Sequence, residues 1–275
     1  VFNGEFNGNS AEYGGAICAY GNMTIQGSQF YNNTASQRGG AIYIEGQVSD
    51  CIINSTFVGN SAYQGGAIFF NNETDNNVIA GYFEGNSAER IGGALCFQAK
   101  SCDNVISAEF YNNTARAASG GAIFFRNIAE GNQFESVFRS NRAVYGAGIF
   151  FYNKANNNRF NSDFSSNVAN SSGGAMVFHN TTNNNNFSGS FVGNSALGLV
   201  DEANSNGGAL AFRDVSSNCV FDCDFINNTA AQGGGGVNYR QTPHDIVFNG
   251  DFINNEAAYG GAFSFYGSLD NVVFN

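Results

Sequence analysis

The stretch Phe57-Val-Gly-Asn-Ser-Ala-Tyr-Gln-Gly-Gly-Ala-Ile-Phe-Phe70 decides the fold of this chain, because it recurs ten times with small changes. Each copy carries the tetrad Phe-x-x-Asn and then a Gly-Gly-Ala block followed by an apolar residue. Successive tetrads lie 24 to 34 residues apart and begin at Phe6, Phe30, Phe57, Phe83, Phe110, Phe138, Phe164, Phe191, Phe225 and Phe252. A repeat of this period indicates a solenoid in which each turn stacks on its neighbours.

The residues that lead into each tetrad alternate between two faces. In the third repeat Ile53, Ser55 and Phe57 are separated by polar residues, and the equivalent positions elsewhere are large, small and large. Only Gln26 interrupts the large apolar row four residues before the phenylalanine. This period of two predicts a strand with one buried face.

The Gly-Gly-Ala block begins a second predicted strand, in which positions such as Ile68 and Phe70 are apolar or small in every repeat and face the core. Between the two strands, the residue before each tetrad asparagine is Gly, Asn or Ser, which suits a left-handed corner. Two short strands and a corner per repeat predict a right-handed parallel β-helix of ten coils, as one continuous domain over residues 1–275. We expect the tetrad asparagines to form a structural ladder of amides, with Asn60, Asn86, Asn113 and Asn194 among its members.

Long polar segments follow the second strand at residues 71–77, 153–158 and 180–186, and we expect surface loops there. The one large insertion, residues 197–206, precedes Gly207. It is either a decorated corner or a contact loop, since repeat proteins often place insertions on a binding face.

Composition limits the partners. The formal net charge is −11, from 22 acidic and 11 basic residues. Such a surface repels phosphate, so we expect no nucleic acid partner. No apolar run reaches membrane length, so this segment is not expected to span a bilayer. The chain begins inside a repeat at Val1-Phe2-Asn3, so we expect part of a longer exported protein whose uncapped ends permit self-association.

The two tetrads, repeated in phase, resemble the repeats of the chlamydial polymorphic outer membrane proteins and of adhesin-like surface proteins of methanogenic archaea. The run Phe225-Ile-Asn-Asn-Thr-Ala230 is of this style, and the resemblance covers all ten repeats. Departures are small, as at Gly146-Ala147-Gly148-Ile149. The resemblance implies an extracellular β-helical stalk or passenger used in adhesion at the cell surface. It brings no catalytic residues, and the carboxy-terminal membrane barrel of the chlamydial proteins is not in this sequence.

Catalysis is not expected, so we predict a protein that is not an enzyme. Many parallel β-helices cleave polysaccharides, which requires clustered carboxylates or a base beside bound calcium. The only histidines, His179 and His244, fall in different parts of their repeats and do not suggest a catalytic pair.

One acidic group is a candidate metal site. Asp222, Asp224 and Asp251 occupy outward strand positions on adjacent repeats, next to Asn249. Stacked carboxylates repel one another, and a cation would relieve the repulsion. They are therefore either solvated surface acids or a weak calcium site, and no other cofactor is expected.

The six cysteines permit disulfides without fixing their pairs. Cys96 and Cys102 flank one loop and could close it. Cys223 occupies a small inward position, which favours a buried thiol. No Cys-x-x-Cys or histidine pairing suggests a zinc site.

One outward row is apolar. In Gly-Gly-Ala-Ile-x-Phe the x position carries Tyr43, Phe69, Phe124 and Phe150. Because its neighbours in the strand point inward, this row points outward. Either loops cover these aromatic rings, or they form an exposed binding face. We predict that they bind a partner, since aromatic rings stack on sugars and anchor protein contacts.

Three functions remain open from the sequence. The first is an extracellular adhesin-like segment that attaches to a cell-surface protein or glycan. The second is a structural repeat protein that assembles into a surface filament or coat. The third is a polysaccharide-degrading enzyme.

Overall fold

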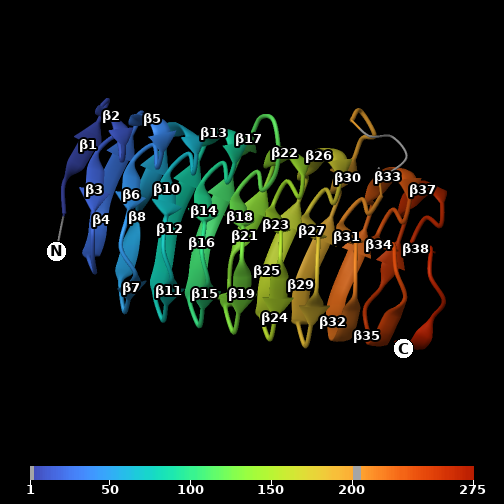
Figure 1. Cartoon of the computed structure of the whole chain (residues 1–275). Helices are drawn as coiled ribbons and strands as arrows, with labels where there is room; N and C mark the ends of the chain where they lie inside the picture. Colours follow the sequence, from blue (N-terminus) through green and yellow to red (C-terminus); the bar gives the residue numbers. More distant parts are fainter. Residues whose placement is uncertain (1–2, 201–205) are drawn as a thin grey trace.

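The computed structural model describes residues 3–200 and 206–275, and every regular element in that part of the chain is a β-strand. The chain winds as a parallel β-helix of about ten turns, in which equivalent strands of successive turns lie side by side (Figure 1). The strands form three parallel sheets along a rod, so the predicted all-β solenoid is confirmed.

The long sheet has nineteen strands and carries the alternating segments before each tetrad. Its register pairs each tetrad phenylalanine with the next, as in Phe57 with Phe83. Its strands are β1 (Glu5–Asn7), β4 (Thr24–Tyr31), β7 (Val48–Ser49), β8 (Ile52–Val58), β11 (Thr74–Asp75), β12 (Val78–Glu84), β15 (Ser101–Cys102), β16 (Val105–Tyr111), β19 (Ile128–Glu130), β20 (Gln133–Phe134), β21 (Val137–Arg139), β24 (Lys154–Asn156), β25 (Arg159–Ser165), β28 (Thr182–Asn183), β29 (Asn186–Val192), β32 (Ser216–Ile226), β35 (Pro243–Phe248), β36 (Phe252–Ile253) and β39 (Asp270–Phe274).

The glycine sheet has ten strands and carries the residues after each Gly-Gly-Ala block. Its strands are three residues long, as expected from the apolar-x-apolar pattern. They are β3 (Ile17–Ala19), β6 (Ile42–Ile44), β10 (Ile68–Phe70), β14 (Leu95–Phe97), β18 (Ile123–Phe125), β23 (Ile149–Phe151), β27 (Met176–Phe178), β31 (Leu210–Phe212), β34 (Val237–Tyr239) and β38 (Phe263–Phe265).

A third sheet, the corner sheet, lies between the other two in each turn, where the sequence suggested only a corner. It contains β2 (Ser10–Tyr13), β5 (Thr34–Arg38), β9 (Ser61–Gln64), β13 (Ser87–Ile91), β17 (Thr114–Ala115), β22 (Arg142–Tyr145), β26 (Val168–Ser172), β30 (Ser195–Ala196), β33 (Thr229–Gly233) and β37 (Glu256–Tyr259). The prediction of two strands per turn was wrong because these segments are short and largely polar.

The interior is built from rows of stacked aromatic rings. Phe57 is fully buried and lies between Phe30 and Phe83, with centroid distances of 4.7 Å to each. These rings stack because the turns are in register and one strand spacing separates them. Where Gln26 breaks the row, a bulge puts Ile25 into the core and pairs it with Ile53.

The tetrad asparagines form the first ladder, which contains the predicted Asn60, Asn86, Asn113 and Asn194. In a typical rung, the backbone N–H and the Nδ2 of Asn113 both donate to Oδ1 of Asn141, at 2.9 and 3.1 Å. The same Nδ2 donates to the Phe83 carbonyl at 2.9 Å. The first ladder runs through Asn9, Asn33, Asn60, Asn86, Asn113, Asn141, Asn167, Asn194, Asn228 and Asn255.

A second ladder lies at the other end of the long strands, where the sequence suggested surface loops. Asn132 is fully buried and donates to Oδ1 of Asn158 from its backbone N–H, at 3.1 Å, and from its Nδ2, at 3.2 Å. The members are Asn77, Asn104, Asn132, Asn158 and Asn185. The loop assignment was therefore wrong for Asn77, Asn158 and Asn185, and short strands such as β11 precede them.

Each ladder asparagine follows a left-handed residue that turns the corner. Asn112, before Asn113, has φ 54°, and Gly131, before Asn132, has φ 68°. The first of these corners was expected from the Gly, Asn and Ser residues in that row. The second glycine of the Gly-Gly-Ala block has a different role, because a Cβ on Gly66 would lie 2.0 Å from the Gly93 carbonyl oxygen of the next turn.

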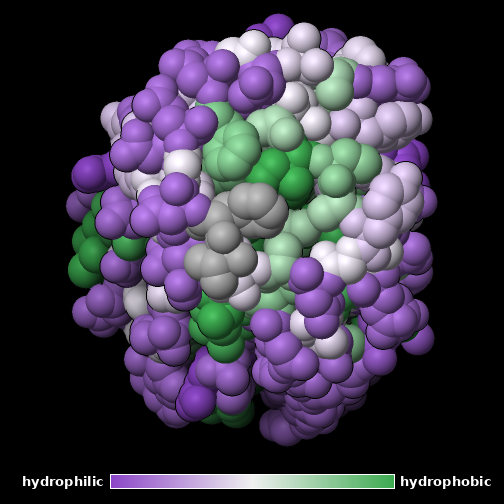
Figure 2. Space-filling view, turned by 90° about the vertical axis from the view of Figure 1, so that its left-hand side faces the viewer, coloured by the Kyte–Doolittle hydropathy of each residue, from purple (hydrophilic) through white to green (hydrophobic). Residues whose placement is uncertain are grey.

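Seen from the end of the rod where the chain begins, apolar residues occupy the middle of the face and polar residues surround them (Figure 2). Phe6, Ala16 and Ile17 are only partly buried and pack against the core from the first described turn. Phe263 and Phe265 do the same in the last turn. Polar residues therefore surround the apolar core at the end of the rod where the chain begins (Figure 2).

Candidate functional site

The outward aromatic row predicted as a binding face is buried. Phe69 is 0% exposed, Phe124 is 4% exposed and Phe150 is 3% exposed. Together with Tyr43 and its neighbours, they form a second apolar cluster that is separate from the main core. The row points outward as predicted, but the expected exposure is wrong. The cover comes from residues on both sides of the row.

One cover is Arg38, at the end of β5. Its guanidinium lies 4.9 Å from the centroid of the Phe69 ring, and its Nη1 donates to Oδ1 of Asn71 at 2.9 Å. Arg38 therefore crosses the row from the corner sheet to the far end of β10. On the preceding turn, the Tyr43 hydroxyl donates to the Glu45 carboxylate. Burial and that carboxylate raise the pKa of Tyr43 to about 12.

A second cover comes from the opposite direction. Arg213, which follows β31, places its guanidinium 4.5 Å from the centroid of the Tyr145 ring at the end of β22. Tyr145 itself packs against the buried row. Long side chains from both flanks therefore cover these rings. This cover could not be predicted from the sequence, because each partner lies one or more turns away.

The predicted metal site is not assembled. Asp222, Asp224 and Asp251 are all exposed. Asp222 accepts a hydrogen bond from the Asn249 amide, and Oδ1 of Asp224 accepts one from the Asp251 backbone N–H at 3.0 Å. In the described ranges, no three or more Asp, Glu, His or Cys side chains are grouped to hold a metal ion. The structure gives these acids the geometry of solvated surface residues with amide partners.

All six cysteines are free thiols, so Cys96 and Cys102 do not close a loop. Cys96 lies in the covered aromatic row, and Cys102 lies in β15 of the long sheet. Cys223 is buried in the main core, as predicted, and burial raises the pKa of its thiol above the usual range.

The two histidines lie on different turns. His179 follows β27, and its ring stacks on Tyr152 with a centroid distance of 5.0 Å. His244, in β35, has its Nδ1 2.7 Å from Oδ2 of Asp270. The structure does not bring the two histidines together.

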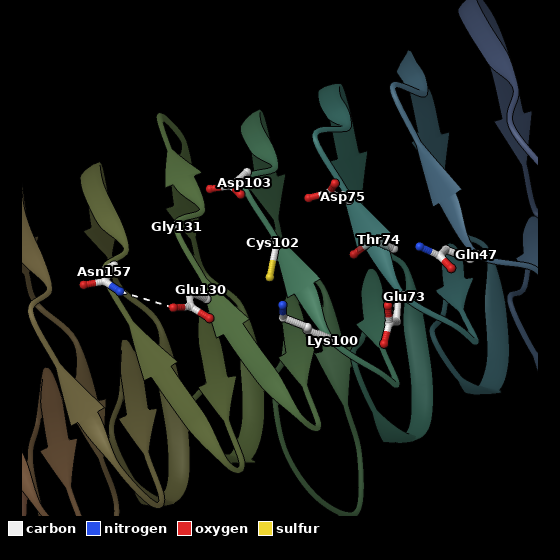
Figure 3. Close-up of a pocket in the computed structure, with 10 residues that line it drawn as sticks. All are labelled: Gln47, Glu73, Thr74, Asp75, Lys100, Cys102, Asp103, Glu130, Gly131 and Asn157. Carbon is white, nitrogen blue, oxygen red and sulfur yellow. Dashed lines mark hydrogen bonds between the residues drawn. The ribbon is translucent and has the colours of Figure 1, made fainter.

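A hollow of about 420 Å³ lies on the outer side of β11, β15 and β19. Figure 3 shows Lys100 and Cys102 at its centre, with Glu73 and Glu130 on either side. Burial raises the pKa of the Cys102 thiol, and the nearby ammonium of Lys100 opposes this shift.

The hollow was not predicted from the sequence because its residues come from short strands and loops of several turns. The available signal was that polar or ionisable residues, Asp75, Cys102 and Glu130, occupy the same position in successive turns. Asp75 and Asp103 are exposed, so water screens their charges.

The fold defines the chain as a parallel β-helix repeat domain. The model of the Chlamydia polymorphic membrane protein (Chlamydia_PMP) repeat matches residues 3–20, 27–45 and 107–126. These stretches are similar to the repeats of that family, which confirms the resemblance of the tetrads to the chlamydial polymorphic membrane proteins. No curated protein and no solved structure matches the chain.

The repeat family and the β-helix fold together indicate a segment of a surface protein, associated with the outer membrane or cell surface. None of the described residues belongs to a helix that is long and apolar enough to cross a membrane.

Proposed function

We propose that this chain is the extended, extracellular part of an adhesin-like surface protein, and that it attaches to a protein or glycan on another cell. The observation that carries the proposal is the combination of polymorphic membrane protein repeats with a rod of about ten turns. In-register stacking holds side chains on the outer faces at one strand spacing, about 4.8 Å per turn, so a partner is bound without first ordering the site.

The expectations about nucleic acid, catalysis and cofactors are part of the same proposal. Nucleic acid is not among them, because the formal net charge of −11 opposes phosphate. Catalysis is not part of the proposed role either, and no metal or other cofactor is required for it.

The test is surface display of the chain on a non-adherent bacterium, followed by counting of attached cells on animal, plant and microbial cell layers. We expect attachment to at least one layer, and competition by the soluble chain. Resistance to protease shows whether the displayed chain is folded. A folded chain that attaches to none of the layers contradicts the proposal.

The second candidate is a filament or coat built by end-to-end assembly. Sedimentation and electron microscopy of the purified chain distinguish the two: separate rods favour the adhesin, and regular fibres favour the coat. Turnover of acidic polysaccharides would instead favour an enzyme.

A further inference from the structure

A row of cationic and aromatic side chains follows the glycine sheet over five successive turns. It consists of Arg126, Tyr152, His179, Arg213 and Arg240, which we call the cationic row. Each residue comes directly after a strand of the glycine sheet, and its backbone N–H donates to the phenylalanine carbonyl that ends the strand of the preceding turn, at 2.9 Å throughout. The row is therefore straight and about 19 Å long, at about 4.8 Å per turn.

The side chains of this row lie on the outer side of the sheet. The Tyr152 and His179 rings are 6.4 and 6.2 Å from the ring of Phe150, which belongs to the outward cluster. Arg126 and Arg240 are exposed, whereas His179 and Arg213 are half-buried. The cationic row thus forms the accessible edge beside the covered aromatic cluster.

The charge of the row contrasts with the rest of the molecule. Three arginines stand here in a chain with a net charge of −11. The pKa of His179 is lowered, first by burial and then by the charge of Arg213, with a smaller effect from Arg240. The Asp214 carboxylate and the Tyr152 backbone oppose that shift. Arg213 and Arg240 therefore both lie close enough to His179 to act on its charge, and the Asp214 carboxylate acts in the opposite sense.

Sugar-binding chemistry lies next to the charge. Tyr152 and His179 are stacked with an interplanar angle of 6°, and half of the Tyr152 side chain is exposed, at 48%. One residue further along, the exposed amides of Asn127, Asn153 and Asn180 form a hydrogen-bonded row with distances of 3.3 and 3.2 Å. Flat rings accept the apolar face of a sugar, and amides bond its hydroxyl groups.

We propose that the cationic row binds an acidic polysaccharide, with the arginines on its carboxylate or sulfate groups and Tyr152 against a sugar ring. The partner class rests on the proposed adhesive function. A polymer fits better than a small anion because the row extends over five turns. A nucleic acid fits less well, since its binding requires many phosphate contacts and most of this surface is acidic.

The test measures binding of the whole chain to four fluorescent probes: a heparin oligosaccharide, an oligogalacturonate, neutral dextran and single-stranded oligothymidylate. We expect heparin, oligogalacturonate or both to bind, and dextran not to bind. Preference for heparin over oligogalacturonate would indicate recognition of sulfate groups, and the reverse preference would indicate recognition of carboxylates. Binding should weaken as salt rises, because the arginines are close to the surface.

Matched variants locate the site. Arg126→Gln with Arg240→Gln should weaken binding about tenfold, since two exposed ion pairs are lost. Arg139→Gln with Arg159→Gln makes the same change in net charge on the exposed face of the long sheet, and should change binding less than twofold. Tyr152→Ser should weaken binding severalfold, whereas Tyr111→Ser, at a strand end of the long sheet, should not.

Three results overturn the proposal: no binding to either acidic sugar, equal losses in the two arginine pairs, or tighter binding of oligothymidylate. Cell attachment of the displayed Arg126→Gln/Arg240→Gln variant separates this inference from the proposed function. Unchanged attachment contradicts the proposed role of the cationic row but is compatible with the proposed adhesive function. Sugar binding without any cell attachment supports the row and contradicts the adhesin.

Discussion

The two asparagine ladders do the same work at opposite ends of the long strands, yet they stop in different ways. The first ladder runs from Asn9 to Asn255, through every described turn. The second runs only from Asn77 to Asn185, and a cysteine lies at each end of it. The Cys51 backbone N–H donates to Oδ1 of Asn77 at 2.9 Å, and Asn185 donates to the sulfur of Cys219.

The cysteines show how a buried ladder can end inside a protein. A ladder asparagine donates to the next turn and so needs an acceptor there, while its own oxygen accepts from the turn before. The sulfur of Cys219 accepts from the last asparagine but brings no amide donors of its own, so the next turn can be apolar, as it is at the buried Ile246. At the other end, the Met23 backbone N–H donates to the Cys51 sulfur at 3.2 Å.

The largest loss of stability is expected in the aromatic row beside the first ladder. Phe110 is 1% exposed and stacks between Phe83 and Phe138 at 5.0 and 4.9 Å. Phe110→Ala should lower the free energy of unfolding by about 3–5 kcal/mol, because it leaves a cavity in a packed stack. Urea unfolding followed by circular dichroism measures this loss. A neutral effect would mean that the register is wrong.

Equivalent substitutions in the middle of each ladder test whether the ladders are equal. Asn113→Ala and Asn132→Ala should each cost about 1–3 kcal/mol, because the donors of the preceding turn lose their acceptor in a buried site. Urea unfolding and local hydrogen exchange measure both. Asn112→Ser, at the left-handed position beside the first ladder, controls for the corner itself. If Asn132→Ala has no effect while Asn113→Ala does, the hydrogen bonds of the second ladder do not contribute to stability.

The end of the second ladder should be less sensitive than its middle. Cys219→Val removes the acceptor for Asn185 and should cost about 1 kcal/mol, whereas Cys219→Ser keeps an acceptor and should change stability by about 0.5 kcal/mol or less. Thermal melting of the two variants under reducing conditions measures the difference. Equal melting temperatures would show that the sulfur does not serve as the last rung.

The asparagines of the two ladders do not titrate, so they predict no dependence of stability on pH. His179 does titrate, and we expect it to make stability depend on pH. Its pKa is lowered from 6.5 in the fold, by burial and by Arg213, so the unfolded chain binds more protons once the pH falls below about 6.5. Stability should therefore fall with pH through that range and level off below the folded pKa. His179→Gln should flatten this profile, as measured by melting between pH 7.5 and 5.

His244→Gln is the matched control, because His244 lies on an exposed strand position beside Asp270. If both variants change the profile equally, the effect does not arise from the buried surroundings of His179.

The repeats by themselves determined the winding of the chain, the inward rows and the first ladder. Phe-x-x-Asn and Gly-Gly-Ala recur in phase, so like residues must stack on like residues once the period is recognised. Buried Cys223 also followed from the small residues in its row. The predicted adhesive role and partner remain proposals, and the insertion at residues 197–206, either a decorated corner or a contact loop, lies partly outside the described residues.

Only the tertiary structure decided which outward residues reach solvent. Alternation along a strand gives the direction of a side chain, but its exposure depends on what neighbouring turns place over it. Phe69 points outward and is still buried, because Arg38 from the corner sheet lies across its ring. The second ladder was not predicted because its asparagines lie in polar segments that resemble surface loops. Only hydrogen bonds between turns make the burial of these asparagines favourable.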